Sequence, residues 1–301
     1  MSCPLPADPG RRILMAHGGG GSLTGSLIAA MLDRFGRPAP GDLHDSALLE
    51  GCNGTPAFTT DSYVVTPLFF PGGDIGSLAV YGTVNDLAVT GAVPHSLALG
   101  FIIEEGFPID LLMRVADSAA AAARRARVSI VTGDTKVVER GKCDGLYISS
   151  SGVGFVPCGI RSNPGSIRDG DLVILSGDIG RHGIAIMAAR HGLGLETAIE
   201  SDAAPLSGIL EALLSSGVSP HCMRDLTRGG LASALNEIAA ESGMGIEIEE
   251  GLVPVLEDVR GACELLGLDP LHVACEGRMV LFADPSEGAA ALAAMGSCPE
   301  A

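Results

Sequence analysis

One long apolar stretch, residues 78–103, sets the strongest limit on how this chain can fold. It reads LAVYGTVNDLAVTGAVPHSLALGFII, and it is interrupted at Asn85, Asp86, Pro94 and His95. A transmembrane helix needs roughly 18 to 20 consecutive apolar residues, and the sequence contains no such run. The hydrophobic fraction of 47% and the mean hydropathy of +0.36 therefore predict buried helices and strands of a folded core, without a membrane span.

Net charge and cysteine spacing narrow the class of function. The chain has 19 Lys and Arg against 36 Asp and Glu, and its formal net charge of −17 would repel a phosphate backbone, so we expect no nucleic-acid partner. The eight cysteines include no Cys-x-x-Cys pair and no tight cluster with histidine, which argues against a zinc site. The N-terminus has no apolar segment of signal-peptide length, and we expect a cytoplasmic protein.

The length of 301 residues suits two domains. In the first half, composition predicts strands at 56–65, 95–103, 128–138 and 145–156, and helices at 74–92 and 109–127. Pro108 directly precedes the second helix, a position that proline favours at a helix start. The resulting order β-α-β-α-β-β indicates an α+β layer.

Proline and glycine turn signals around residue 159 separate this half from a second α/β series. Strands are predicted within 171–177, 245–251 and 272–284, and helices within 182–192, 222–243, 255–267 and 287–296, the one within 222–243 preceded by a loop. Because the sequence stops shortly after residue 296, we expect the strand within 272–284 to lack its packing partner. The expected division is an N-terminal segment 1–40 with a glycine-rich loop, a first domain 41–158 and a second domain 159–301.

The glycine run AHGGGGSLTGS, residues 16–26, resembles a phosphate-binding turn because it follows a strand-like segment. Its spacing matches neither G-x-G-x-x-G nor a P-loop, which needs Lys followed by Ser or Thr. Two interpretations therefore stay open: a flexible linker or turn, and a backbone-amide cradle or lid over phosphate.

Acidic residues recur beside small residues at turns and strand ends, at Asp45, Asp61, Asp86, Asp134 and Asp225. Any one of them alone is more often a helix cap or a solvated turn. Two unit charges about 4 Å apart interact by roughly 4 kcal/mol at an effective dielectric of 20, so several carboxylates converge only around cations. An all-oxygen site selects Mg²⁺, which is typically shared with substrate phosphates.

A few basic residues lie beside these carboxylates, namely Lys136, Arg224 and Arg228. Surface ion pairs of little energetic value are the simplest explanation. Their position next to acidic residues and to Gly229 and Gly230, which open a predicted helix, also suits a nucleoside triphosphate.

Several motifs, in order and over nearly the whole chain, closely resemble the HypE family of hydrogenase maturation factors. They are TTDSYVVTPLFFPGGDIGSLAVYGTVNDLAVTGA, FIIEEGFP, VTGDTKVVERG, RDLTRGGLASALNEIA and CELLGLDPLHVACEGRMV. More broadly the chain is similar to the PurM-like superfamily of aminoimidazole ribonucleotide (AIR) synthetase, which includes selenophosphate synthetase and thiamine-monophosphate kinase. Those relatives share the Asn-Asp and Asp-x-Thr motifs but not PLFFPGGDIG.

The resemblance implies a two-domain α+β and α/β fold, in which the N-terminal domains of two subunits pair into a barrel-like dimer beside an ATP site. It implies ATP-dependent dehydration of a thiocarbamate, carried on a C-terminal cysteine, to a thiocyanate that supplies the cyanide ligands of nickel–iron hydrogenase. Implied partners are a carbamoyltransferase and an iron-carrying HypC–HypD complex.

The resemblance also assigns roles to individual positions of this sequence. The implied Mg²⁺ ligands are Asp45, Asp61, Asp86 and Asp225, and the implied nucleotide-binding residues are Asp61, Asn85, Asp86, Gly133, Asp134, Thr227 and Arg228. Lys136 is expected near the reacting thiocarbamate, on a strand that delivers it and Asp134 to the reacting end of ATP. Glu276 is expected to accept the proton, and the glycine run with His17 to cover the phosphates.

One departure from the family bears on activity. The family ends in a tail finishing Pro-Arg-x-Cys, whereas this sequence ends MGSCPEA, so Cys298 is not expected to carry the thiocarbamate. The second domain is accordingly expected to lack its last strand and tail. Two other functions stay open: a related ATP-dependent synthetase or small-molecule kinase, and a tailless scaffold that docks maturation partners without catalysis.

Overall fold

The computed structural model describes residues 12–19, 22–36, 54–191 and 199–300. Within these ranges, no helix combines the length and the apolar character that a membrane crossing requires. Asp45, one of the predicted metal ligands, lies outside the described residues.

A four-stranded sheet forms the first domain, in the order β1-β6-β4-β5. The strands are β1 (Thr55–Tyr63), β4 (Val93–Glu104), β5 (Ser129–Val138) and β6 (Leu146–Val156). β6 pairs antiparallel with β1 and β4, and β4 pairs parallel with β5, so β1 and β5 form the two edges. These four strands and the two helices between them follow the predicted β-α-β-α-β-β order, whereas a helix at 22–35 and a short hairpin at 69–74 were not predicted.

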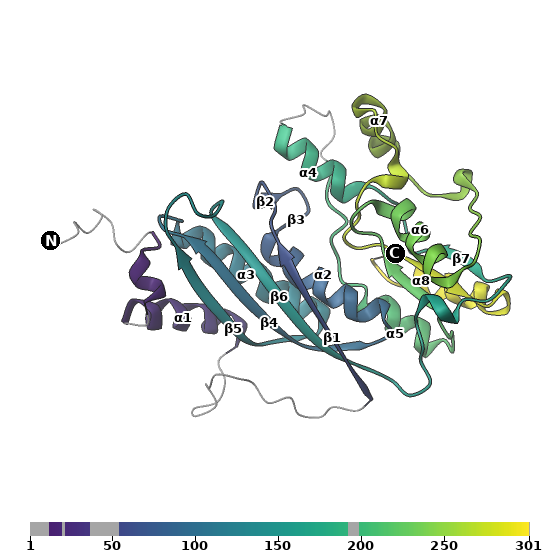
Figure 1. The fold of residues 1–301 in the computed structure, drawn as a ribbon, viewed down its shortest axis with the longest axis horizontal. Coiled ribbons are helices and arrows are strands. Elements are labelled where there is room, and N and C mark those ends of the chain that lie inside the picture. The colour runs from purple at the N-terminus through teal and green to yellow at the C-terminus, as the bar shows by residue number, and fades with distance from the viewer. Residues whose placement is uncertain (1–11, 20–21, 37–53, 192–198, 301) are drawn as a thin grey trace.

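In the described part of the chain, helices cover only one face of this sheet. Figure 1 shows α2 (Ile75–Val89) and α3 (Ile109–Ala126) lying behind the strands, with α1 (Ser22–Phe35) beside α3. The inward residues of β4, such as Leu99 and Phe101, are buried, whereas on the opposite face Ile102 is 38% exposed and Phe58 of β1 is 71% exposed. The strand period of two therefore separates an apolar inner face from an uncovered outer face.

α2 is the central helix of the molecule, and almost every residue in it is buried. It starts at Asp74, whose carboxylate accepts hydrogen bonds from the backbone N–H groups of Gly76 and Ser77. A short hairpin of β2 (Phe69–Phe70) and β3 (Gly73–Asp74) leads into it. α2 packs against the sheet, against α3 and against α5 and β8 of the second domain, which explains why its sequence is apolar all round.

The second domain is built on a three-stranded antiparallel sheet, in the order β7-β9-β8. Its strands are β7 (Leu172–Leu175), β8 (Cys222–Asp225) and β9 (Met279–Ala283). The helices are α4 (Arg181–His191), α5 (Ser207–Ser215), α6 (Gly230–Ser242), α7 (Glu257–Leu266) and α8 (Gly288–Gly296). Single 3-10 turns occur at Met15–Gly18 (η1), Pro164–Ser166 (η2), Glu250–Leu252 (η3), Pro270–His272 (η4) and Pro285–Glu287 (η5).

Three expectations for the second domain need correction. Residues 245–251 form no strand; they are irregular and end in η3, since no described strand lies beside them to accept a ladder of hydrogen bonds. The segment 222–243 begins with strand β8 rather than a loop. β9 was expected to lack a packing partner, but it is fully buried and hydrogen-bonded to β7 and β8 on its two sides.

Candidate active site at the junction of the two domains

Carboxylates from both domains converge where α2 meets the second domain. Asp61 comes from β1, Asp86 from α2, Asp225 from the end of β8, and Glu276 from the segment just before β9. Thr59 Oγ1 donates to Asp86 Oδ2 at 2.8 Å, and Asp61 lies near enough to Asp86 for a hydrogen bond between the two carboxyl groups. We call Asp61, Asp86, Asp225 and Glu276 the carboxylate cluster.

A half-buried tyrosine of β1 fixes Asp61 in this cluster. Tyr63 OH donates to Asp61 Oδ2 at 2.9 Å and lies 3.4 Å from Thr83 Oγ1 of α2. The ring passes α2 at Gly82, where an added Cβ would lie 2.3 Å from Tyr63 OH. The glycine is therefore required for a close approach of side chain to helix, and this approach sets the place of Asp61.

Burial and neighbouring like charges raise the pKa values of Asp86, Asp225 and Glu276. Burial, then Asp225 and Asp61, raise the pKa of Asp86 to about 7. Burial is also the main cause that raises the pKa of Glu276 well above its usual range, with Asp225, Asp202, Asp61 and Asp86 adding to it. The pKa of Asp225 is raised by burial too. Such crowding disfavours ionisation unless a cation neutralises it.

The cluster fits Mg²⁺ in charge and donor type, because carboxylate oxygens are the hard ligands that this ion prefers. Among the described residues, however, no group of three or more His, Cys, Asp or Glu side chains is arranged to enclose a metal ion. This donor set suits an ion that is shared with phosphate oxygens better than one held by protein alone.

Asn85 lies at the contact between α2 and the second domain. The side chain is 2% exposed, and its amide nitrogen donates to Ala204 O and Glu276 O, each at 3.0 Å, while its oxygen accepts Leu206 N–H at 2.7 Å. Because both ends of the amide are hydrogen-bonded to protein, Asn85 joins α2 to the second domain; its role in nucleotide binding stays a prediction. The two neighbouring residues thus differ in position: Asn85 connects the two domains, and Asp86 belongs to the carboxylate cluster.

The residues after β8 lie beside the cluster. Asp225 ends β8, Thr227 O accepts Gly230 N–H at 3.0 Å, and α6 begins at Gly230 as predicted. Arg228 is exposed and lowers the pKa of Asp225, which opposes the larger effect of burial. Arg224 forms a surface ion pair with Glu237 of α6, the simpler of the two roles considered for it.

The described chain does not bring Asp134 and Lys136 to the carboxylate cluster. Both are exposed residues of β5, the edge strand farthest from β1. In the register of the sheet, Asp134 is level with Gly100, on the outer face, whereas Asp61 pairs with the buried Ser150 on the inner face. Gly133 permits close strand packing, since a Cβ there would lie 2.4 Å from Leu99 O.

Part of the glycine run is helical. His17 lies in η1 and is 5% exposed, and its Nδ1 accepts Leu14 N–H at 2.9 Å. A Cβ at Gly18 would lie 3.0 Å from Val137 Cβ of β5. His17 therefore stabilises the turn, and its ring is not presented to a phosphate; Gly20 and Gly21 lie outside the described residues.

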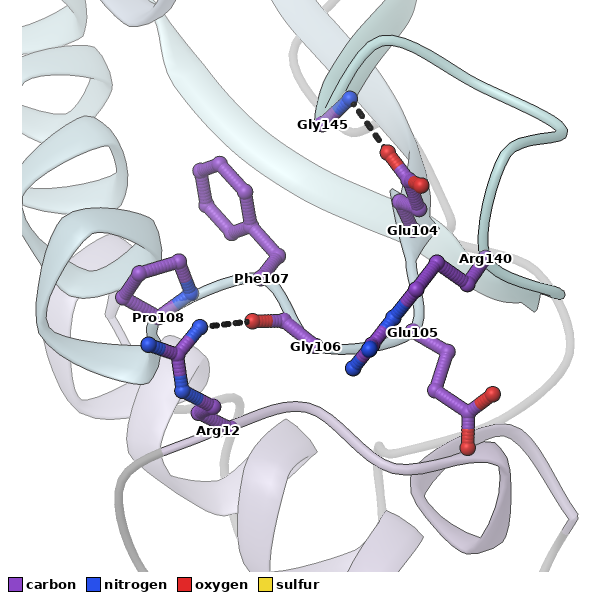
Figure 2. A pocket seen from close by; sticks show the side chains of 8 residues that line it. All are labelled: Arg12, Glu104, Glu105, Gly106, Phe107, Pro108, Arg140 and Gly145. Atoms are coloured by element: carbon purple, nitrogen blue, oxygen red, sulfur yellow. Dashed lines mark hydrogen bonds between the residues drawn. The ribbon is translucent and has the colours of Figure 1, made fainter.

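A cavity of about 580 Å³ lies apart from the cluster, at the end of β4 (Figure 2). It is lined by Arg12, Glu104, Glu105, Gly106, Phe107, Pro108, Arg140 and Gly145. Glu104 accepts backbone N–H groups of Gly141 and Gly145, which lowers its pKa, and Arg12 Nη1 donates to Gly106 O at 2.7 Å. These hydrogen bonds connect the FIIEEGFP segment to the neighbouring segments of the chain.

Four further polar residues at the junction escaped sequence reasoning: Tyr63, His182, Ser201 and Asp202. The last three are 7%, 7% and 4% exposed, and their sequence context shows no metal-ligand or catalytic spacing. The one available signal was that PLFFPGGDIG is not shared by the wider superfamily, and its hairpin is what contacts His182 and Ser201.

Comparison with known proteins identifies the family. The chain matches the AIR synthase related protein family, with the N-terminal domain at residues 43–156 and the C-terminal domain at residues 168–301. It is 50% identical to carbamoyl dehydratase HypE of Azotobacter vinelandii, over 95% of this chain and 84% of that one. It is 44% identical to carbamoyl dehydratase HypE of Escherichia coli, over 95% and 87%.

Solved structures agree with this assignment. A crystal structure of hydrogenase maturation protein HypE in complex with ATP superposes with a TM-score of 0.92 at 45% identity, covering 95% of this chain and 86% of that chain. A HypE–HypF complex matches with a TM-score of 0.79 at 45% identity, covering 93% and 90%. With its two AIR synthase related domains and half of its residues shared with characterised relatives, the chain belongs to the HypE family of carbamoyl dehydratases, enzymes of hydrogenase maturation.

Proposed function

We propose that this carbamoyl dehydratase uses Mg·ATP to convert the S-carboxamide of a C-terminal cysteine into a thiocyanate, the source of cyanide ligands for nickel–iron hydrogenase. The observation that carries the proposal is the carboxylate cluster, where burial and then the neighbouring Asp225 and Asp61 raise the pKa of Asp86 to about 7. The 45% identical HypE that was crystallised with ATP supports a nucleotide at this junction.

Asp61, Asp86 and Asp225 are the residues that would hold Mg²⁺ against the nucleotide phosphates. They are contributed by three separate elements, and Tyr63 and Thr59 orient two of them. Asp45 belongs to the same proposed set, and Thr227 and Arg228 would contact the phosphates from the loop before α6. An ion held by these residues would supply positive charge beside the transferred phosphoryl group.

Glu276 is the proposed proton acceptor. In the overall reaction the amide oxygen leaves as phosphate, ATP becomes ADP, and the nitrogen gives up its two protons to leave a carbon–nitrogen triple bond. A base beside the nitrogen must take up a proton in the elimination, and a carboxylate with a raised pKa does so more readily than an ordinary one. Burial and four neighbouring carboxylates raise the pKa of Glu276 in this way.

We further propose a homodimer built on the uncovered face of the first-domain sheet. Phe58, Ile102 and Val131 are exposed on β1, β4 and β5, and an apolar sheet face of this kind is normally covered. Asp134 and Lys136 share that face, so pairing it with a second copy would place them against the partner subunit. This arrangement would give Lys136 the access to a reacting group that a single chain does not provide.

The proposed domains are 41–158 and 159–301, preceded by the segment 1–40, with the turn region near Gly159 as the boundary. The two family matches, which end at residue 156 and resume at residue 168, support this division. The proposed partners are a carbamoyltransferase, supported by the solved HypE–HypF complex, and a HypC–HypD iron-carrying complex, in the cytoplasm.

Calorimetric titration with ATP, with and without Mg²⁺, tests the site. We expect Mg²⁺-dependent binding by the native chain and a loss of at least about tenfold in affinity for Asp86→Asn and for Asp225→Asn, because each removes a metal-binding charge. Asp110→Asn, at the exposed start of α3, is the matched control and should bind as the native chain does. Equal affinity in all four proteins would overturn the assignment of the cluster.

The reaction itself is tested with a synthetic peptide that ends in S-carbamoylated cysteine, supplied in trans with Mg·ATP. We expect phosphate release together with an infrared band of the thiocyanate triple bond. Phosphate release that needs a small phosphate-accepting substrate and not the peptide would favour a related kinase, and an absence of nucleotide binding would favour a non-catalytic scaffold.

A further inference from the structure

His182, the second residue of α4, is held by a specific hydrogen bond. Its Nδ1 lies 2.8 Å from Ser201 Oγ, and that same oxygen accepts Ala203 N–H at 3.1 Å. The serine hydroxyl has one proton to donate, and His182 Nδ1 is the acceptor within reach. With the serine as donor to Nδ1, we assign the proton of the neutral imidazole to Nε2.

Nε2 of His182 faces Glu276. It lies 3.9 Å from Glu276 Oε1, longer than a hydrogen bond, as catalytic pairs often are before ligand binds. Burial lowers the pKa of His182 to about 4, so the ring is a neutral donor near pH 7. Among the described residues, no side chain donates a hydrogen bond to the Glu276 carboxylate in this structure, and His182 Nε2 is the donor that faces it.

The β2–β3 hairpin holds His182 and Ser201 from the first domain. The Phe70 ring meets the His182 ring edge to face, with centroids 5.6 Å apart, and Pro71 O accepts Ser201 N–H at 2.9 Å. A Cβ at Gly72 would lie 2.6 Å from Ser201 N. The PLFFPGG segment thus packs directly on His182 and on Ser201, the residue that orients the His182 imidazole.

The backbone of Glu276 is held independently of its carboxylate. Its N–H donates to Asp202 Oδ1 at 3.1 Å, and its carbonyl accepts from Asn85 Nδ2 at 3.0 Å. At the next residue, a Cβ on Gly277 would lie 2.0 Å from Asp202 O. With the main chain held in this way, the side-chain torsions are the remaining freedom, and His182 is the donor placed to limit them.

We propose that His182, held by Ser201 and the β2–β3 hairpin, is a positioning residue that donates a hydrogen bond from Nε2 to Glu276 and so orients this carboxylate toward the substrate amide. The inference rests on the proposed role of Glu276 as proton acceptor. It adds a function for the PLFFPGG hairpin, which the nucleotide site does not use.

The test compares His182→Leu with His182→Gln in the dehydration assay with S-carbamoylated cysteine peptide and Mg·ATP. Leucine removes the donor, whereas the Gln side-chain amide places an N–H close to the position of Nε2. We expect His182→Leu to lower kcat by about 10- to 100-fold with the KM for ATP within about twofold of native. His182→Gln should recover most of the lost kcat, which a purely structural role would not produce.

Ser201→Ala provides a second variant that leaves the imidazole in place and removes its orienting hydroxyl. We expect an intermediate loss of kcat, again without a change in KM for ATP. Thermal melting of each variant separates loss of orientation from loss of fold. Native kcat in both His182→Leu and Ser201→Ala, or equal losses for His182→Leu and His182→Gln in folded proteins, would overturn the proposal.

Glu276→Gln, assayed in parallel, separates this inference from the proposed function. If Glu276→Gln abolishes dehydration while His182→Leu has no effect, only the positioning role of His182 fails. If Glu276→Gln keeps the native rate, Glu276 is not the proton acceptor, and the proposed positioning role of His182 is also wrong.

Discussion

Gly82 is a residue at which an added methyl group should disturb the candidate site. Its Cβ would lie 2.3 Å from Tyr63 OH, and Tyr63 in turn orients Asp61. We expect Gly82→Ala to reduce the free energy of unfolding by about 1–3 kcal/mol through overpacking, and to weaken Mg·ATP binding. Chemical denaturation and calorimetry measure the two effects.

Gly261→Ala is the matched control for this substitution. Gly261 lies inside α7, and nothing is found within 4 Å of the Cβ that would be added. Alanine there should raise stability by about 0.5–1 kcal/mol through helix propensity and leave nucleotide binding unchanged. If the two variants had the same stability, the close approach of Tyr63 to α2 would not be a constraint.

Asp86 gives the stability of the ligand-free chain a pH dependence. Its pKa rises from the ordinary 3.8 to about 7 in the folded protein, chiefly because it is buried. A carboxyl with a higher pKa in the folded state stabilises that state while it is protonated. The contribution is therefore complete below about pH 4 and is lost as the pH rises through about 7.

Asp86→Asn should flatten this pH dependence. At pH 8 we expect the variant to be more stable than the native chain by about 1 kcal/mol, a value reduced by the partial exposure of the side chain. The same variant should bind Mg·ATP more weakly, so stability and binding move in opposite directions. Urea unfolding at pH 4, 6 and 8 measures the effect, and parallel pH profiles for the two proteins would rule it out.

At the scale of secondary-structure elements, the hydrogen bonds of Asn85 connect α2 with the second domain. Asn85→Ala would leave Ala204 O, Glu276 O and Leu206 N without their partner in a buried junction. We expect a loss of about 2–4 kcal/mol in the free energy of unfolding. Differential scanning calorimetry should show a lower melting temperature and separation of one transition into two; an unchanged single transition would contradict this role.

The elements that the sequence predicted well share a local cause. The helix over 109–127 has a strong amphipathic pattern and a proline before its first turn, and the structure places α3 at Ile109–Ala126. Residues 245–251 alternate in the same way as a strand, yet they form none. Alternation predicts only which side chains share a face; a strand also needs a neighbour, and that is decided far away in the sequence.

At the scale of the whole molecule, the exposed outer face of the first-domain sheet leads to a prediction about dimer formation. Phe58 is 71% exposed at the outer face of β1. Phe58→Lys should weaken the proposed dimer, because a buried interface would have to accommodate an unpaired charge. Sedimentation velocity of the native chain should give a dimer, and of the variant a larger share of monomer.

Leu265→Lys is the control for the dimer prediction. Leu265 is 80% exposed on α7 in the second domain, away from the sheet face. The same change of charge there should leave the sedimentation coefficient unchanged. A native monomer, or equal effects of the two lysines, would remove the proposed interface and with it the access of Lys136 to a partner subunit.

The candidate site was predictable only in part, for a physical reason that individual residues make clear. Asp61, Asp86 and Asp225 could be named from the sequence because ionisable residues beside small ones are visible there, and Glu276 was named from the family resemblance. The sequence did not show that the amide of Asn85 forms hydrogen bonds to the second domain. Nor did it reveal His182, Ser201 or Asp202, since burial and mutual distance leave no periodic signal.

By itself, the sequence determined the order of helices and strands in the first domain, the family, and the chemical type of the site, because these follow from local periodicity and from residue identity. Only the tertiary structure decided which face of the sheet stays open, which carboxylates meet, and that His182 faces Glu276. These features arise when segments as distant as Asn85 and Glu276 are brought into contact, and the free energy of such contacts depends on burial and geometry that no local pattern encodes.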